Sequence, residues 1–137
     1  MSILLDTHVL IWAADESPQL KPSARAILSD PSQNIFVSSA TALELAIKWS
    51  IGKLVLPKDP SDFVKEFLDV SGFSQMAISV RDALAVAELP LYHKDPFDRL
   101  LVAQAKTHGL RLMTADPVLE QYDVDVIALW LDDEDDE

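Results

Sequence analysis

The 137-residue chain contains no cysteine, only three glycines, and 11 basic residues against 23 acidic ones. Without cysteine the protein forms no disulfide and offers no thiolate, which excludes zinc sites of the thiolate type and fits a reducing compartment. Gly52, Gly72 and Gly109 are isolated from one another, and no Gly-Lys-Ser or Gly-Lys-Thr sequence occurs. Because P-loops and dinucleotide-binding loops need clustered glycines, neither kind of phosphate site is expected.

Long apolar runs are also missing. The N-terminal segment has no basic residue and reaches an acid at Asp6, too early for a secretory signal peptide. No stretch approaches the roughly 20 apolar residues that cross a bilayer. The hydrophobic content of 49% is sufficient for one domain with its own core. We therefore expect a soluble, cytoplasmic, single-domain protein with no membrane contact.

The shortage of basic residues gives a formal net charge of −12. This charge argues against a nucleic-acid partner, because Lys and Arg supply much of the affinity for phosphates. Part of the acidity, however, lies in the terminal run 132–137, which is typical of a solvated tail, and bound cations would offset clustered acids elsewhere. We place one domain at residues 1–131 and an acidic tail at 132–137, and an oligonucleotide substrate is not excluded.

Short apolar runs alternate with helical patterns, which is typical of an α/β fold with a mostly parallel sheet flanked by helices. The apolar runs predict strands at 3–6, 34–37, 76–80, 110–114 and 126–129. The segments between them predict helices at 7–14, 22–29, 40–50, 60–71, 81–88, 97–108 and 117–121.

Four acids stand where such a fold could bring them together. Asp6 and Asp116 follow apolar runs, Glu44 lies in an amphipathic helix, and Asp98 opens another helix. Ligand sites in open α/β sheets gather at the carboxyl ends of the strands, and clustered carboxylates there are suited to a hard cation. The sequence therefore predicts a divalent-metal site.

Each acid also has a purely structural explanation. Asp6 could cap the helix that follows it, and Asp95 and Asp116 each precede a proline, as N-cap residues often do. Glu44 has Lys48 four residues later, which would suit an exposed ion pair. For each acid taken singly, these explanations stay open.

Asp98 is the most informative acid, because at helical spacing it shares a face with Leu101, Val102 and Ala105. An unpaired carboxylate on a core-facing stripe is costly, and a bound cation would relieve that cost. The alternative is an acid in the first helical turn that faces free backbone amides, with Asp95 as the N-cap.

Four sequence blocks resemble the PIN-domain nucleases, and within them the VapC-type toxins of prokaryotic toxin–antitoxin pairs. The blocks are LLDTH at 4–8, SSATALE at 38–44, HKDPFDRLLVAQA at 93–105 and TAD at 114–116, of which the third is the most specific. The resemblance implies that Asp6, Glu44, Asp98 and Asp116 are the catalytic, metal-binding acids. Asp95 is similar to an additional acid of the subgroup that carries DPFDR.

The resemblance further implies a three-layer α/β/α sandwich with a mostly parallel central sheet, and a Mg²⁺- or Mn²⁺-dependent endoribonuclease. A two-metal type of in-line hydrolysis would leave a 5′-phosphate and a 3′-hydroxyl. Thr7 and Thr114 could orient ligands or water, or could serve only local capping and backbone bonds. Arg99, with His93 and Lys94, could contact substrate phosphate, the alternatives being solvation or, for Arg99, an ion pair with a nearby acid.

The implied partners are an RNA substrate, a small antitoxin protein whose tail occludes the acidic site, and a second copy of the chain in a homodimer. The tryptophans Trp12, Trp49 and Trp130 and the apolar segment 49–56 are candidates for these interfaces or for the core. Two other classes stay open. One is a housekeeping PIN-type nuclease that acts on structured DNA or RNA, and the other is a non-catalytic scaffold module that retains the fold.

Overall fold

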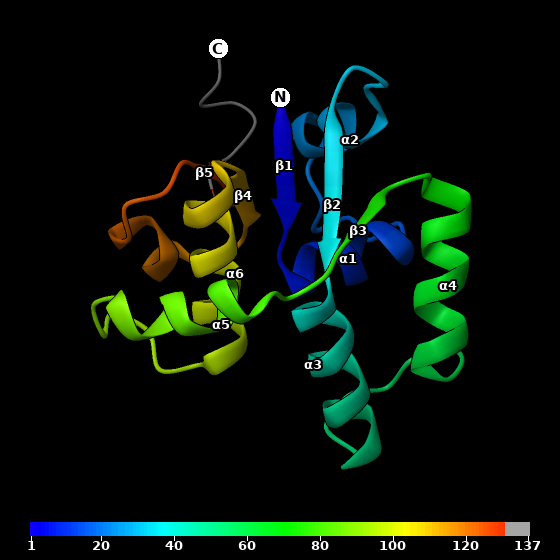
Figure 1. Cartoon of the computed structure of the whole chain (residues 1–137). Coiled ribbons are helices and arrows are strands. Elements are labelled where there is room, and N and C mark those ends of the chain that lie inside the picture. Colours follow the sequence, from blue (N-terminus) through cyan, green and yellow to red (C-terminus); the bar gives the residue numbers. More distant parts are fainter. Residues whose placement is uncertain (131–137) are drawn as a thin grey trace.

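The computed structural model of the chain describes residues 1–130, and the predicted acidic tail at 132–137 lies outside them. One sheet of five parallel strands has the order β3-β2-β1-β4-β5. The strands are β1 (Ser2–Leu5), β2 (Asn34–Ser38), β3 (Ser74–Met76), β4 (Arg111–Thr114) and β5 (Val126–Ala128). Helices cover both faces, which confirms the predicted α/β/α sandwich (Figure 1).

Six α-helices and two short 3-10 helices connect the strands in the described part of the chain. They are α1 (Thr7–Ala14), α2 (Pro22–Ser29), α3 (Ser39–Ser50), α4 (Pro60–Ser71), α5 (Val80–Ala85), η1 (Val86–Glu88), α6 (Pro96–His108) and η2 (Pro117–Gln121). Within residues 1–130, none of these helices has the length and apolar character needed to cross a membrane.

Two buried cores lie on opposite faces of the sheet because side chains alternate along each strand. From β1, Ile3 and Leu5 enter the core that is covered by α1, α2 and α4, whereas Leu4 enters the core under α6. The central strand β4 divides in the same way, with Met113 in the first core and Leu112 in the second. A strand buried on both faces explains why these runs are continuously apolar in the sequence.

The predicted strand at 76–80 is wrong in position, since β3 ends at Met76. Ser79 instead caps α5 with a capping box. The Ser79 hydroxyl accepts from the Asp82 amide, and the Asp82 carboxylate accepts from the Ser79 amide. Strand pairing and this cap cannot share the same residues, so the chain leaves the sheet before Ser79. The predicted helix at 81–88 is split into α5 and η1, and the segment 117–121 is a 3-10 helix.

A buried polar network fastens α5 and α6 to the end of β2. Asp82 is 1% exposed, and its two oxygens accept from Gln104 Nε2 at 3.2 Å and contact His108 Nε2 at 2.8 Å. The Ser38 hydroxyl donates to the other side of the Gln104 amide. Burial raises the pKa of Asp82, but the hydrogen bonds from Ser79, Gln104 and His108 outweigh it and hold the pKa below its ordinary value. The carboxylate is therefore ionised and anchors three elements.

We expect Asp82→Asn to lower the free energy of unfolding by about 2 kcal/mol at neutral pH, because it removes charge-assisted bonds from a buried site. Since the folded-state pKa of Asp82 lies below its ordinary value, this contribution is present above that value and disappears as the pH falls through the folded-state pKa. Urea unfolding measures both effects, with Asp69→Asn at an exposed position of α4 as the control of equal charge. Equal stabilities of the two variants would contradict the role of the network.

Candidate metal centre

The acidic site lies where the strand order reverses. From β1 the chain adds β2 and β3 toward one edge of the sheet, and it then adds β4 and β5 toward the other edge. Ligands of open α/β sheets bind at such a switch point, beyond the carboxyl ends of the strands. Asp6 directly follows β1, and Asp116 lies two residues beyond β4. The other acids reach this point from α3 and α6.

Asp6 combines a capping role with a place in the site. Its Oδ1 accepts from the Val9 amide at 2.9 Å, so it is the N-cap of α1. The side chain is 3% exposed, and this burial raises the pKa of Asp6 even though a hydrogen bond with Thr114 opposes the rise. The capping explanation and the site explanation therefore hold together, since the cap fixes the direction in which the carboxylate points.

Glu44 is buried in α3 and is bonded through both oxygens. The Thr7 hydroxyl donates to Oε1 at 2.6 Å, and the Lys48 ammonium donates to Oε2. The ion pair with Lys48 is therefore present, but it is not an exposed surface pair, because Glu44 is only 4% exposed. Thr7, the first residue of α1, thus fixes the orientation of the Glu44 side chain.

Asp95 and Asp98 begin α6 side by side. Asp95 is the N-cap, and its Oδ1 accepts from the amides of Phe97 at 2.8 Å and Asp98 at 3.1 Å. Burial raises the pKa of Asp98 to about 7, with further contributions from the negative charges of Asp95, Asp6 and Glu44. The carboxylate of Asp98 is thus close enough to those of Asp95, Asp6 and Glu44 to be repelled by each of them.

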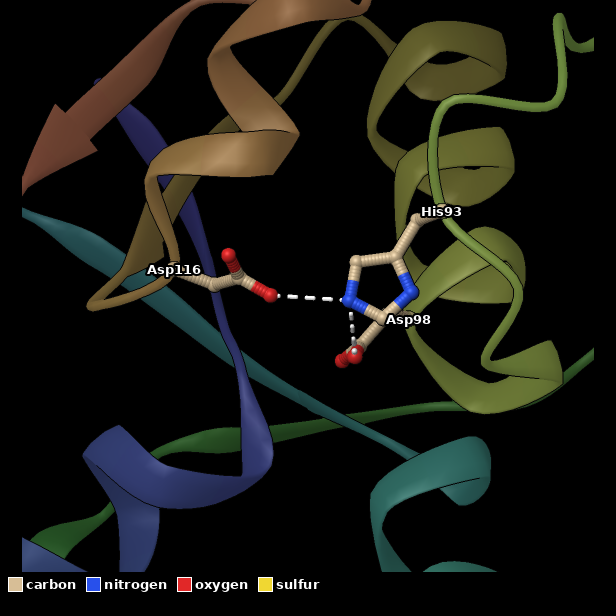
Figure 2. A group of neighbouring side chains, drawn as sticks. All are labelled: His93, Asp98 and Asp116. Carbon is tan, nitrogen blue, oxygen red and sulfur yellow. Dashed lines mark hydrogen bonds and ion pairs between the residues drawn. The ribbon is translucent and has the colours of Figure 1, made fainter.

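His93 joins Asp98 to Asp116 across the site (Figure 2). Its Nε2 lies 2.8 Å from Asp116 Oδ2 and 3.3 Å from Asp98 Oδ2. The Asp95 amide donates to His93 Nδ1 at 3.0 Å, so the ring proton lies on Nε2 and points to the two carboxylates. Asp116 meanwhile caps η2 through Oδ1, which accepts from the Val118 amide at 3.0 Å. Both acids are therefore fixed by bonds that leave part of each carboxylate directed into the site.

The sequence offered His93 as a contact of substrate phosphate or as a solvated side chain, whereas the structure places it among the acids. Together with Asp98 and Asp116 it offers ligand atoms that all lie within 4.8 Å of one another. Its position depends on the loop before α6, which no local pattern specifies. The only signal in the sequence was its place at the start of the block HKDPFDRLLVAQA, two residues before Asp95.

Arg99 supports the loop that carries His93. One terminal nitrogen donates to the Pro90 carbonyl at 2.9 Å and to Tyr122 Oη at 3.3 Å, while the other donates to the Val86 carbonyl at 3.1 Å. Tyr122 Oη also accepts from the His93 amide at 3.0 Å. These bonds give Arg99 partners within the fold, and its predicted contact with substrate phosphate stays a prediction.

Thr114 lies between the two acids that follow β1 and β4. It is fully buried, its hydroxyl accepts from the Asp116 amide at 3.0 Å, and it shares a hydrogen bond with Asp6. It therefore couples the orientations of Asp6 and Asp116.

A divalent cation fits this arrangement. The donors are mainly carboxylate oxygens, which are the ligands that Mg²⁺ and Mn²⁺ prefer. Burial is the largest cause of the raised pKa of Asp98, and the negative charges of Asp95, Asp6 and Glu44 add to it. A cation would favour the ionised form of each acid and remove their repulsion.

Comparison with known proteins identifies the family. The sequence matches the family model of the PIN domain over residues 3–125. The chain belongs to the PIN-domain family. This membership confirms the resemblance carried by the four sequence blocks, and it implies a nuclease that uses divalent metal ions. A search of curated proteins found no match to this PIN domain.

Solved structures with the same fold include toxin–antitoxin complexes. VapBC2 from Rickettsia felis, bound to a promoter DNA fragment, has a chain with 15% identity and a TM-score of 0.70, covering 93% of this chain and 98% of that one. DNA-bound VapBC from Salmonella typhimurium has a chain with 16% identity and a TM-score of 0.67, covering 94% of this chain and 98% of that one. FitAcB from Neisseria gonorrhoeae has a chain with 23% identity and a TM-score of 0.63, covering 93% of this chain and 98% of that one. At these identities the likeness establishes the fold.

We expect Asp98→Asn to stabilise the metal-free PIN domain by roughly 2 kcal/mol at about pH 8. The folded-state pKa of Asp98 is above its ordinary value of 3.8, so the wild type loses stability as the pH rises from about 4 to about 7, and asparagine avoids that loss. Urea unfolding in the presence of EDTA measures the difference, which should vanish below about pH 4. A variant less stable than the wild type at the higher pH would contradict the repulsion.

Proposed function

We propose that this PIN domain is a Mg²⁺- or Mn²⁺-dependent endoribonuclease that acts as the toxin of a toxin–antitoxin pair. The observation that supports it best is the convergence of Asp6, Glu44, Asp98 and Asp116 at one end of the sheet. These acids come from four separate elements, and burial raises the pKa of Asp98 to about 7, with smaller contributions from the charges of Asp95, Asp6 and Glu44. A scaffold that does not bind metal has no use for that repulsion.

The proposed reaction is hydrolysis of an RNA phosphodiester by a two-metal type of mechanism. Bound cations would polarise the scissile phosphate, activate water and stabilise the departing 3′ oxygen. The residues of the chain hold the ligands in place: Thr7 orients Glu44, and Thr114 orients Asp6 and Asp116. Asp95 would be an accessory ligand, since its Oδ1 is already engaged by two backbone amides.

The antitoxin partner is supported by the structural neighbours and by a surface groove. The groove has a volume of about 670 Å³ and lies between α1, α2 and α4, where Phe63, Phe67 and Phe73 line it. Arg25 and Lys58 line it together with Asp15, Glu16 and Glu66, and Lys58 is paired with Glu66, so the apolar side chains are what an apolar antitoxin segment would contact. We propose that part of a small antitoxin protein occupies this groove while its tail reaches the acidic site.

We also propose a homodimer in the cytoplasm. Leu43 and Ile47 on α3 and Ile51 at its C-cap recur every four residues and are 50%, 41% and 59% exposed. Trp49 is exposed nearby, whereas Trp12 packs against the first core. The segment 49–56 is divided in the same way, because Leu54 and Leu56 pack inward. A monomer in light scattering would contradict the dimer.

Calorimetric titration of Mn²⁺ tests the enzymatic proposal. We expect saturable binding by the wild type, a loss of affinity of at least about tenfold in Asp98→Asn, and loss of Mn²⁺-dependent RNA cleavage in the same variant. Asp69→Asn changes the net charge equally at an exposed position and should leave both properties intact. A folded wild type that binds no Mn²⁺ would instead favour a non-catalytic scaffold.

Expression in a bacterial host tests the toxin assignment. The wild type should arrest growth and degrade RNA, Asp98→Asn should not, and co-expression of a neighbouring small open reading frame should restore growth. A catalytically active chain that leaves growth unaffected and has no such neighbour would support the housekeeping nuclease instead.

A further inference from the structure

Lys48 brings a positive charge into the acidic site. Its ammonium bonds Glu44, and the side chain is 37% exposed. The ion pair spans one turn of α3, and its carboxylate end is buried while its ammonium end is not. The ammonium group is therefore bonded to a buried acid of the site and is still open to solvent.

The neighbouring basic side chains are engaged differently. Arg99 is bonded to backbone carbonyls and to Tyr122, and His93 is fixed by the Asp95 amide and directed at Asp116. The partners of Arg99 are not proposed metal ligands, and the His93 ring is also held through Nδ1 by the Asp95 amide. Lys48 is bonded to Glu44, a carboxylate that the proposed cation would also take.

We propose that Lys48 is a phosphate-contacting residue of the active site that exchanges partners during binding. In the metal-free protein its ammonium neutralises Glu44. A cation bound by Glu44 would compete for Oε2 and repel the ammonium, which lies on a flexible four-carbon stem. The released ammonium then pairs with a phosphate of the RNA, the anion that enters the same site. This role rests on the proposed ribonuclease function.

The exchange predicts effects of opposite sign for one substitution. Lys48→Met removes a competitor for Glu44, so Mn²⁺ should bind more tightly. The same change removes a phosphate contact, so RNA should bind more weakly. If Lys48 merely held Glu44 in position, its loss would weaken Mn²⁺ binding and leave the salt dependence of RNA binding unchanged.

The test compares Lys48→Met with Lys106→Met, which makes the same charge change at an exposed position ten residues beyond the start of α6. Calorimetry measures Mn²⁺ affinity. Fluorescence anisotropy measures binding of a labelled single-stranded RNA of random sequence over a series of KCl concentrations. Ca²⁺ replaces Mn²⁺ in the RNA assay, because its loose coordination suits binding better than cleavage. Circular dichroism confirms that each variant is folded.

We expect Lys48→Met to bind Mn²⁺ about threefold to tenfold more tightly and RNA about threefold to tenfold more weakly than Lys106→Met. The slope of log K against log salt should become shallower by about 0.7, the value for one lost phosphate contact on a single strand. Lys48→Arg, which keeps the charge, should retain the slope.

Two results would overturn the inference in distinguishable ways. In the first, the wild type binds Mn²⁺ saturably, but Lys48→Met binds it more weakly or keeps the salt slope of the wild type. That result would show that Lys48 does not contact phosphate, and the nuclease proposal would be unaffected. In the second, the wild type does not bind Mn²⁺, which would contradict both the role of Lys48 and the proposed nuclease function.

Discussion

Repulsion among carboxylates gathered at one end of a parallel sheet is the constraint on which the architecture of the site depends. The acids cannot disperse, because each is fixed by the element that carries it: Asp6 caps α1, Asp95 caps α6, and Asp116 caps η2. Burial then strengthens their interaction by excluding solvent. Burial and, to a smaller extent, the neighbouring negative charges raise the pKa of Asp98. A site of this kind is prepared for a cation before any cation arrives.

The chain limits that cost with internal donors. Thr7 and Lys48 donate to Glu44, while His93 donates to Asp116 and lies close to Asp98. The donors differ in how firmly they are held. Thr7 and His93 are fixed by the structure around them, whereas Lys48 reaches the site on a flexible and partly exposed stem. That difference separates groups that orient the acids from a group that can change partner when substrate binds.

The sequence predicted the fold well where apolar runs coincide with buried strands. The strands β1, β2, β4 and β5 lie within about two residues of their predicted positions, because they are long enough or apolar enough to stand out. The edge strand β3 was misplaced, since three largely polar residues pair there and the apolar residues that follow turn toward α5. Helix starts were accurate where a capping residue precedes proline, as at Asp95 and Asp116.

By itself, the sequence determined the α/β class, the family and which acids could form a site, because strand runs, caps and the DPFDR block are local patterns. Only the tertiary structure decided how those acids are held. The bond from Thr7 to Glu44 joins residues far apart in the sequence, and the position of His93 depends on Arg99 and Tyr122 holding its loop. The spacing of Glu44 and Lys48 predicted an exposed ion pair, but in the folded protein Glu44 is buried. Such relations depend on which elements meet, and no local pattern encodes that.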